Sequence, residues 1–107
     1  MLERTLRIAQ LYDIYGPLLT ERQRELIELH YLQDLSLGEI ADQNGVTRQA
    51  VHDQLARAER ALESYEERLG LLARRAAARE RLQEARDLLL RGELARAAAI
   101  LAGLIDE

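Results

Sequence analysis

The side chains best suited to a chemical role lie together in the stretch SLGEIADQNGVTRQAVHDQL, which runs from Ser36 to Leu55. An arginine can bind both acceptors on the edge of a guanine, and a glutamine can pair in the same way with an adenine. A threonine at a helix N-terminus can help to hold a phosphate. These residue types predict contacts to nucleic acid from the beginning of one helix. The side chains expected to make them are Thr47, Arg48, Gln49 and His52, with Arg57 farther along.

Two more arginines precede this stretch. Arg22 and Arg24 stand at the start of another expected helix and could clamp a second phosphate. For every one of these residues, the alternative is a solvated helix surface. Asp53 and Arg57 are four residues apart, for example, and can pair on a helix without any ligand.

The residues around the turn are typical of a helix-turn-helix. The small residue Ala41 lets a second helix cross close to the first, and Gly45 permits the turn between them. Apolar residues are then expected to lock the two helices together, and Ile40, Val46 and Val51 are the candidates.

The elements that must position this motif are predicted to be helices throughout. Strong helix formers dominate the composition, Pro17 is the only proline, and β-branched residues are scarce. The first helix is expected over residues 2–15, and Gly16-Pro17 ends it. Its apolar stripe is expected to comprise Leu2, Leu6, Ala9, Tyr12 and Tyr15.

Three capping residues predict where the following helices begin. Thr20, with Gln23 three residues later, opens a helix to about Leu32. Ser36, with Glu39, opens a short helix that Asn44-Gly45 breaks, and Thr47 caps a fourth helix. The second helix is expected to bury Leu26, Leu29 and Tyr31.

The fourth helix is long, and its apolar residues recur at alternating steps of four and three. This seam packs either on the first two helices of the same chain, which we favour, or in a coiled coil with a partner. Gly70 either ends the helix or bends it. The residues of the seam are Val51, Leu55, Ala58, Leu62, Tyr65, Leu69 and Leu72.

Two domains are predicted: residues 1–70 form the helix-turn-helix domain, and residues 71–107 form a helical hairpin that turns at Gly92. The hairpin cannot fully bury its own apolar residues, so we expect it to dock on the first domain or on a second chain. A homodimer is therefore predicted. The residues expected to line the two helices are Ala78, Leu82, Ala85 and Leu89 on one, and Leu94, Ala98, Leu101 and Ile105 on the other.

Charge is the main objection to a nucleic-acid role. The formal net charge is −4, and residues 1–70 carry eight arginines against thirteen acids. Neither half is the basic block expected of a nonspecific binder. A run of acids on the fourth helix is interpreted as a solvated face or, alternatively, as a docking surface for a basic partner. These acids are Glu59, Glu63, Glu66 and Glu67.

No arrangement of residues indicates catalysis, so an enzyme, a metal site and a cofactor are not expected. Cysteine is absent, and His30 and His52 have no spacing that would make them ligands of one metal ion. His30 is expected to be a packed or half-exposed helix residue. Without a signal peptide or a long apolar stretch, the chain is expected in the cytoplasm, with no membrane insertion.

Longer stretches resemble known families. The segment LTERQRELIELHYLQDLSLGEIADQNGVTRQAVHDQLARAERAL resembles the C-terminal promoter-reading domain of sigma factors. A closer resemblance, over about residues 5–72, is to the YlxM-like family of helix-turn-helix proteins. LHYLQDLSLGEIA, TRQAVHD and SYEERL carry it. It implies an all-α, sigma-factor-like helix-turn-helix bundle, here with a long fourth helix and a C-terminal helical hairpin.

Departures from that family's pattern bear on the expected site. His52 stands where the family tends to have tyrosine, which puts base stacking by this residue in doubt. Asn44 and Gln54 stand where helix-turn-helix proteins usually have apolar residues, and Asn44 is expected to loosen the contact between the two helices.

The resemblance implies a role beside the bacterial signal recognition particle, by contact with its RNA or its GTPase. Our first hypothesis is therefore a nucleic-acid-binding accessory protein of that pathway, which binds RNA or DNA. The second is a protein–protein adaptor that binds the GTPase through its acidic fourth helix or its tail. The third is an ordinary transcriptional regulator, and the acidic charge weakens it.

Overall fold

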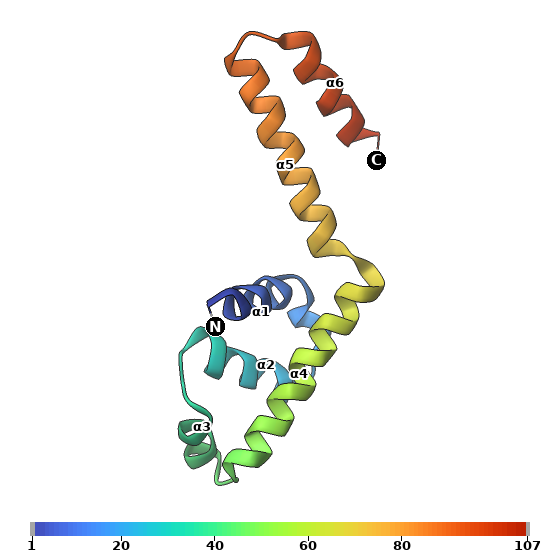
Figure 1. The fold of residues 1–107 in the computed structure, drawn as a ribbon. Helices are drawn as coiled ribbons and strands as arrows, with labels where there is room; N and C mark the ends of the chain where they lie inside the picture. The colour runs from blue at the N-terminus through green and yellow to red at the C-terminus, as the bar shows by residue number, and fades with distance from the viewer. Residues whose placement is uncertain (1, 107) are drawn as a thin grey trace. The chain divides into compact units, whose positions relative to one another are not determined.

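The computed structural model describes residues 2–106 of the protein, and these residues form helices and short connections without a strand (Figure 1). The chain divides into two compact units, one ending at Gly70 and the other beginning at Leu71. The all-α expectation is confirmed. The elements are α1 (Leu2–Tyr15), η1 (Gly16–Leu18), α2 (Glu21–Ile27), η2 (Glu28–Leu32), α3 (Leu37–Asn44), α4 (Arg48–Leu69), α5 (Leu71–Leu90) and α6 (Leu94–Ile105).

The three predicted caps are present. The Thr20 hydroxyl accepts a bond from the Gln23 backbone N–H, and the Gln23 side chain accepts one from the Thr20 backbone N–H. Ser36 and Glu39 make the same reciprocal pair. Thr47 Oγ1 accepts from the backbone N–H of Ala50 at 3.1 Å. Such pairs satisfy backbone donors that a helix start leaves open, so each helix begins where the sequence indicates.

The core of the first unit lies between α4 and the three helices that pack on it, α1, α2 and α3 (Figure 1). The apolar seam of α4 therefore faces its own chain, as favoured above. Gly70 adopts a left-handed backbone with φ 64° and ends α4. The α4 residues buried in this core are Val51, Leu55, Ala58 and Leu62, whereas Leu69 is exposed.

The predicted stripe of α1 is only partly correct, since Tyr15 is buried as predicted but Leu2 and Leu6 are not. Leu2 and Leu6 are exposed, and the buried residues are Ile8, Leu11 and Tyr15. Both sides of α1 are apolar, so helical periodicity alone could not choose between them. The side that is buried also lets two arginines of α1 reach acids of α4, as described below.

Two expected core residues of the second helix are only half-buried. Leu26 is buried as predicted, but Ile27 takes the place expected for Leu29 and Tyr31. The reason is η2, a π-helical turn in which each N–H bonds to the carbonyl five residues back. Side chains after Ile27 therefore depart from the α-helical register.

The second unit is an antiparallel hairpin of α5 and α6, in which Gly92 has a φ of 79° at the turn. Its seam differs from the predicted stripes: Leu82, Leu89, Leu94 and Ile105 are exposed. Small side chains let the two helices approach closely, so the seam is narrow and leaves the larger residues outside. The residues buried along it are Ala85, Leu88 and Ala97.

Candidate nucleic-acid interface

The first turn of α4 is exposed on one side and packs against the core on the other. Gly45 takes the left-handed conformation with φ 65° and ends α3, and its N–H bonds to the carbonyl of Ala41. Ala41 is buried beside Ile40, as a close helix crossing requires. After the Thr47 cap, Val51 is fully buried in the core and anchors the turn. The outward side of the same turn carries polar and charged side chains.

Four of the predicted site residues meet on that outward side. Thr47, Arg48, Gln49 and His52 are all exposed, within one and a half helical turns of one another. Arg57 is exposed as well, but it lies one or two turns farther along α4. The structure therefore brings together the first four residues and leaves Arg57 at the margin.

Asp53 organises this surface. Its Oδ1 accepts a hydrogen bond from Gln49 Nε2 at 2.9 Å and lies 3.3 Å from His52 Nδ1. These bonds, from His52 first and Gln49 second, lower the pKa of the Asp53 carboxyl, and the charge of Arg57 lowers it further. The two side chains are thus pre-oriented by a carboxylate. Carboxylates accept hydrogen bonds from the amino group of cytosine in base recognition.

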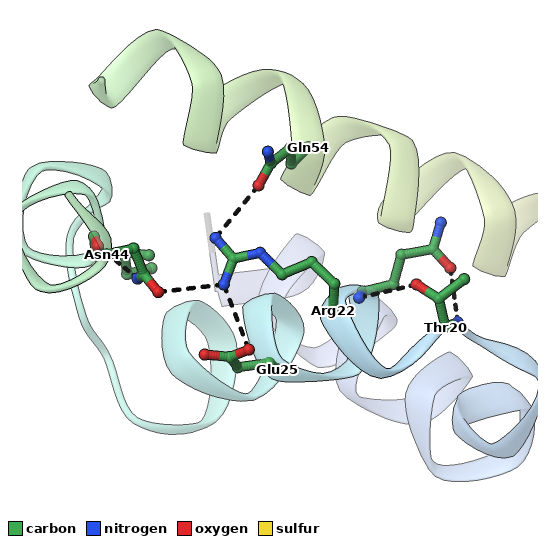
Figure 2. A network of polar contacts seen from close by, with 7 residues as sticks. Thr20, Arg22, Glu25, Asn44 and Gln54 are labelled. Atoms are coloured by element: carbon green, nitrogen blue, oxygen red, sulfur yellow. Dashed lines mark hydrogen bonds and ion pairs between the residues drawn. The ribbon is translucent and has the colours of Figure 1, made fainter. Parts of the chain in front are cut away.

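Arg22 lies behind this surface and joins three helices (Figure 2). One guanidinium nitrogen donates to Asn44 Oδ1 of α3, and the other donates to Gln54 Oε1 of α4, both at 3.3 Å. Glu25, one helical turn along α2, lies 3.3 Å from the same group. The guanidinium is therefore engaged within the protein, whereas the sequence had suggested a phosphate clamp.

The expected loosening at Asn44 does not occur. The Asn44 amide donates to the Ile40 carbonyl at 2.7 Å while its oxygen accepts from Arg22. With Gln54 on the other side, the three residues form a polar lock where an apolar contact was expected. Val46, in contrast, is 41% exposed and contributes little to the lock. Two polar residues at positions that are usually apolar were the signal that could have revealed it.

Arg24 does not join Arg22. Residues two apart on a helix point in nearly opposite directions. Arg24 borders two surface hollows. Glu21 and Glu28 line one of them, and Tyr12 and Pro17 line the other. Arg24 is therefore directed toward α1 and the acids of its own helix, and not toward the start of α4.

The acids of α4 are engaged by distant residues, which corrects their interpretation as a solvated face. Glu63 forms a two-pronged pair with Arg7 of α1, at 3.0 and 2.9 Å, and this bond lowers the pKa of Glu63. Glu66 accepts from the Tyr15 hydroxyl at 2.6 Å. Of the four acids in the run, Glu67 alone is exposed.

Glu59 is the most enclosed of these acids. It lies 3.2 Å from Arg4 and accepts a short hydrogen bond from the Tyr31 hydroxyl. Burial, followed by the bond to Glu59, raises the pKa of Tyr31 to about 12. These contacts join α1 and η2 to α4, and they offset negative charge that the sequence had placed on the surface.

Neither histidine lies in a cluster of metal-ligating residues, and none of three or more occurs within residues 2–106. His30 is half-buried, with Nδ1 2.8 Å from the Leu35 carbonyl and its ring edge-on to Tyr31. Over the same residues, no helix is both long and apolar enough to cross a lipid bilayer.

The chain matches a model of a protein family and is similar in sequence to several known proteins. A family model described as "Putative helix-turn-helix protein, YlxM / p13 like" matches residues 2–97. The UPF0122 protein of Symbiobacterium thermophilum is 53% identical over 101 residues, which cover 94% of each chain. The UPF0122 protein of Geobacillus kaustophilus is 50% identical over 91 residues, covering 85% of this chain and 83% of the relative.

Proposed function

The chain belongs to the YlxM/p13-like family of helix-turn-helix proteins, and from this premise we propose that it is a non-enzymatic regulatory or accessory protein that binds nucleic acid through the first turn of α4. The observation that carries the proposal is the contrast within that turn. Val51 is fully buried, while Arg48, Gln49 and His52 stand exposed around it. A helix held in this way can enter a major groove and place its leading side chains against base edges.

The chemistry of the exposed residues fits base recognition better than bulk charge attraction. Arg48 offers a fork of donors for guanine, and Asp53 offers acceptors for a cytosine amino group. Between Ser36 and Arg60, three arginines stand against four acids. If one copy neutralises only about two to four phosphates, its affinity for random sequence is low and varies little with salt.

The finer proposal concerns the pathway. The family resemblance implies an accessory role for the bacterial signal recognition particle in the cytoplasm, with the particle's RNA as the nucleic acid. The alternatives are an adaptor for a GTPase of that pathway and a transcriptional regulator. Engagement of Glu59, Glu63 and Glu66 within the protein makes the acidic side of α4 a poor docking surface.

The test is a titration with three partners: the particle's RNA, a random-sequence DNA duplex and the purified GTPase, each at two salt concentrations. Replacing Arg48 and Gln49 with alanine should weaken nucleic-acid binding by about 1–3 kcal/mol for each two-pronged base contact that is lost. Arg68→Ala, in the last turn of the same helix, is the matched control and should leave binding unchanged.

Each outcome separates the hypotheses. Preference for the RNA over the duplex supports the signal recognition particle role, and preference for a particular duplex supports a transcriptional regulator. Tight binding of the GTPase without affinity for either nucleic acid would favour the adaptor. If the double variant binds nucleic acid as well as the native protein does, the start of α4 is not the binding surface.

A further inference from the structure

The α5–α6 hairpin has two unlike sides. Along its inner seam lie Ala85, Leu88 and Ala97, with Arg81 and Leu104 half-buried among them. Gly103 lies beside the Arg81 guanidinium, and a Cβ there would be 2.6 Å from one of its nitrogens. The seam therefore buries two alanines and Leu88, and most of the other leucines of the hairpin stay exposed.

One side of the hairpin collects apolar residues. On α5, Leu82 and Leu89 each follow an inner residue by one position, and on α6 Ala98 and Ile105 do the same; Arg86, which follows Ala85, is the one charged residue placed on this side by the same rule. One position is a rotation of about 100° on a helix. Because the helices are antiparallel (Figure 1), the same rotation brings both sets to the same side. This apolar face comprises Leu82, Leu89, Leu94, Ala98, Leu101 and Ile105.

The opposite side is polar. The residues that precede inner positions there are Glu80, Glu84 and Asp87 on α5 and Arg96 on α6. Glu93 lies 2.7 Å from Arg96 and 3.6 Å from Arg91. The hairpin is thus a two-helix layer with one solvated side and one apolar side. On the apolar side, Ile105 is 82% exposed and Leu94 is 65% exposed.

We infer that this apolar face binds the same face of a second copy of the chain, forming an antiparallel four-helix bundle. Charge favours this occupant. Ala78 on α5 and Asp106 after α6 are each fourteen residues from Gly92 at the turn, so they lie at about the same height along the hairpin axis. Arg79 is the next residue after Ala78 and therefore lies at nearly the same height as Asp106. In its own hairpin, Arg79 lies on the outer edge of α5, away from α6. A two-fold axis parallel to the helices places α5 of one copy against α6 of the other, and Arg79 then faces Asp106 of the second copy.

The end of α6 supports the same arrangement. Its last turn contains no basic residue, so the partial negative charge of the helix C-terminus has no cation of its own on that helix. Arg79 at the outer edge of the other copy's α5 supplies one. The arginines along the hairpin also disfavour a strongly basic partner at this face.

The size of the face sets the strength of the association. Helix dimensions give a face about 18 Å long and about 20 Å wide. This is about 360 Å² on each copy, well below the roughly 800 Å² per partner of a standard stable interface, so the association is expected to be weak. The dimer should therefore form reversibly as the protein is concentrated. The inference is independent of the nucleic-acid role, because the apolar face shares no residue with the start of α4.

The experiment is sedimentation equilibrium or light scattering on the full chain over about 1–500 µM. The mass should rise from 12.2 kDa toward twice that value. Leu89→Glu should keep the chain monomeric throughout. Arg96→Glu is the control, because Arg96 lies on the polar side of the hairpin and its side chain is 68% exposed. It should dimerise as the native chain does.

Charge reversal tests the proposed arrangement. Arg79→Glu should raise the dissociation constant several-fold, and adding Asp106→Arg should restore it. Far-ultraviolet circular dichroism on each variant excludes unfolding as the cause of a monomer. A native chain that stays at 12.2 kDa up to 500 µM would overturn the inference. So would equal effects of the changes at Leu89 and Arg96, or no rescue by Asp106→Arg.

Discussion

In residues 2–70, side chains from four helices meet in one core, whereas in the hairpin of residues 71–106 only Leu72, Ala85, Leu88 and Ala97 are buried. The first unit also joins its polar groups over long separations, as Arg7 and Glu63 show. In the hairpin, Arg86 pairs with the next residue in the chain, Asp87. The first unit is stabilised by its own core, so the start of α4 can remain exposed for a ligand. The hairpin buries few side chains of its own, so its apolar face remains to be covered.

The largest expected difference between the units is in the response to losing a leucine. Leu62→Ala removes a fully buried side chain from the first core and should lower the free energy of unfolding by about 2–5 kcal/mol. Leu90→Ala removes an exposed one from the hairpin and should change it by less than about 0.5 kcal/mol. Urea unfolding followed by circular dichroism measures both values. A similar cost for Leu90→Ala would mean that this side chain is covered, in contradiction to its exposure.

The polar lock of the first unit should come next in size. Arg22→Ala leaves Asn44 and Gln54 without their shared donor and should cost about 1–2 kcal/mol in unfolding free energy. It should also weaken nucleic-acid binding, because the angle of α4 is then less restricted. Arg96→Ala, at an exposed hairpin arginine, is the control and should cost little.

A rescue variant distinguishes the lock from a direct phosphate contact by Arg22. Combining Arg22→Met, Asn44→Val and Gln54→Leu replaces the polar lock with an apolar one. The triple variant should recover both the unfolding free energy and binding. Recovered stability with binding still lost would show that Arg22 contacts the ligand.

Alkaline pH should act on the first unit alone. The pKa of Tyr31 is raised to about 12, whereas a tyrosine in an unfolded chain titrates near 10. Because the folded-state pKa is the higher one, its stabilising effect is complete below pH 10 and is lost as pH rises from about 10 to about 12. Tyr31→Phe should make unfolding less sensitive to pH in that window. The hairpin contains no tyrosine, so an equal loss of hairpin structure would contradict this origin.

The smallest effect should come from the exposed ion pairs. Bonding to Arg7 lowers the pKa of Glu63 below its usual value of 4.5. Its contribution is therefore present above pH 4.5 and is lost as pH falls through the folded-state pKa. Since both side chains are 44% exposed, Glu63→Gln should cost only about 0.2–1 kcal/mol at neutral pH. Asp87→Asn in the hairpin should cost still less, and thermal unfolding at pH 7 and pH 3 compares the two.

Local features of the fold were predictable from the sequence, because local chemistry produces them. Thr20, Ser36 and Thr47 cap helices through residues three positions away, and Gly45 ends α3 because it tolerates a positive φ. The exposed start of α4 follows from these features. The resemblance to the YlxM-like family is confirmed as well.

Features that depend on distant partners were not predictable. α1 is apolar on two sides, and the buried side is the one that packs Ile8 and Leu11 into the core while Arg4 and Arg7 reach acids of α4. The seam of the hairpin follows from how closely two alanine-rich helices approach, which periodicity does not reveal. At the candidate site, the residue types pointed to Arg22, but its position between Asn44 and Gln54 depends on three helices meeting.

The most direct test of the central claim is an NMR titration of the isotopically labelled protein with the particle's RNA or a DNA duplex, following every backbone amide. The account predicts that the largest shift changes fall on residues 47–53, with weaker changes near Arg22. Changes concentrated on α5 and α6, with residues 47–53 unaffected, would contradict it.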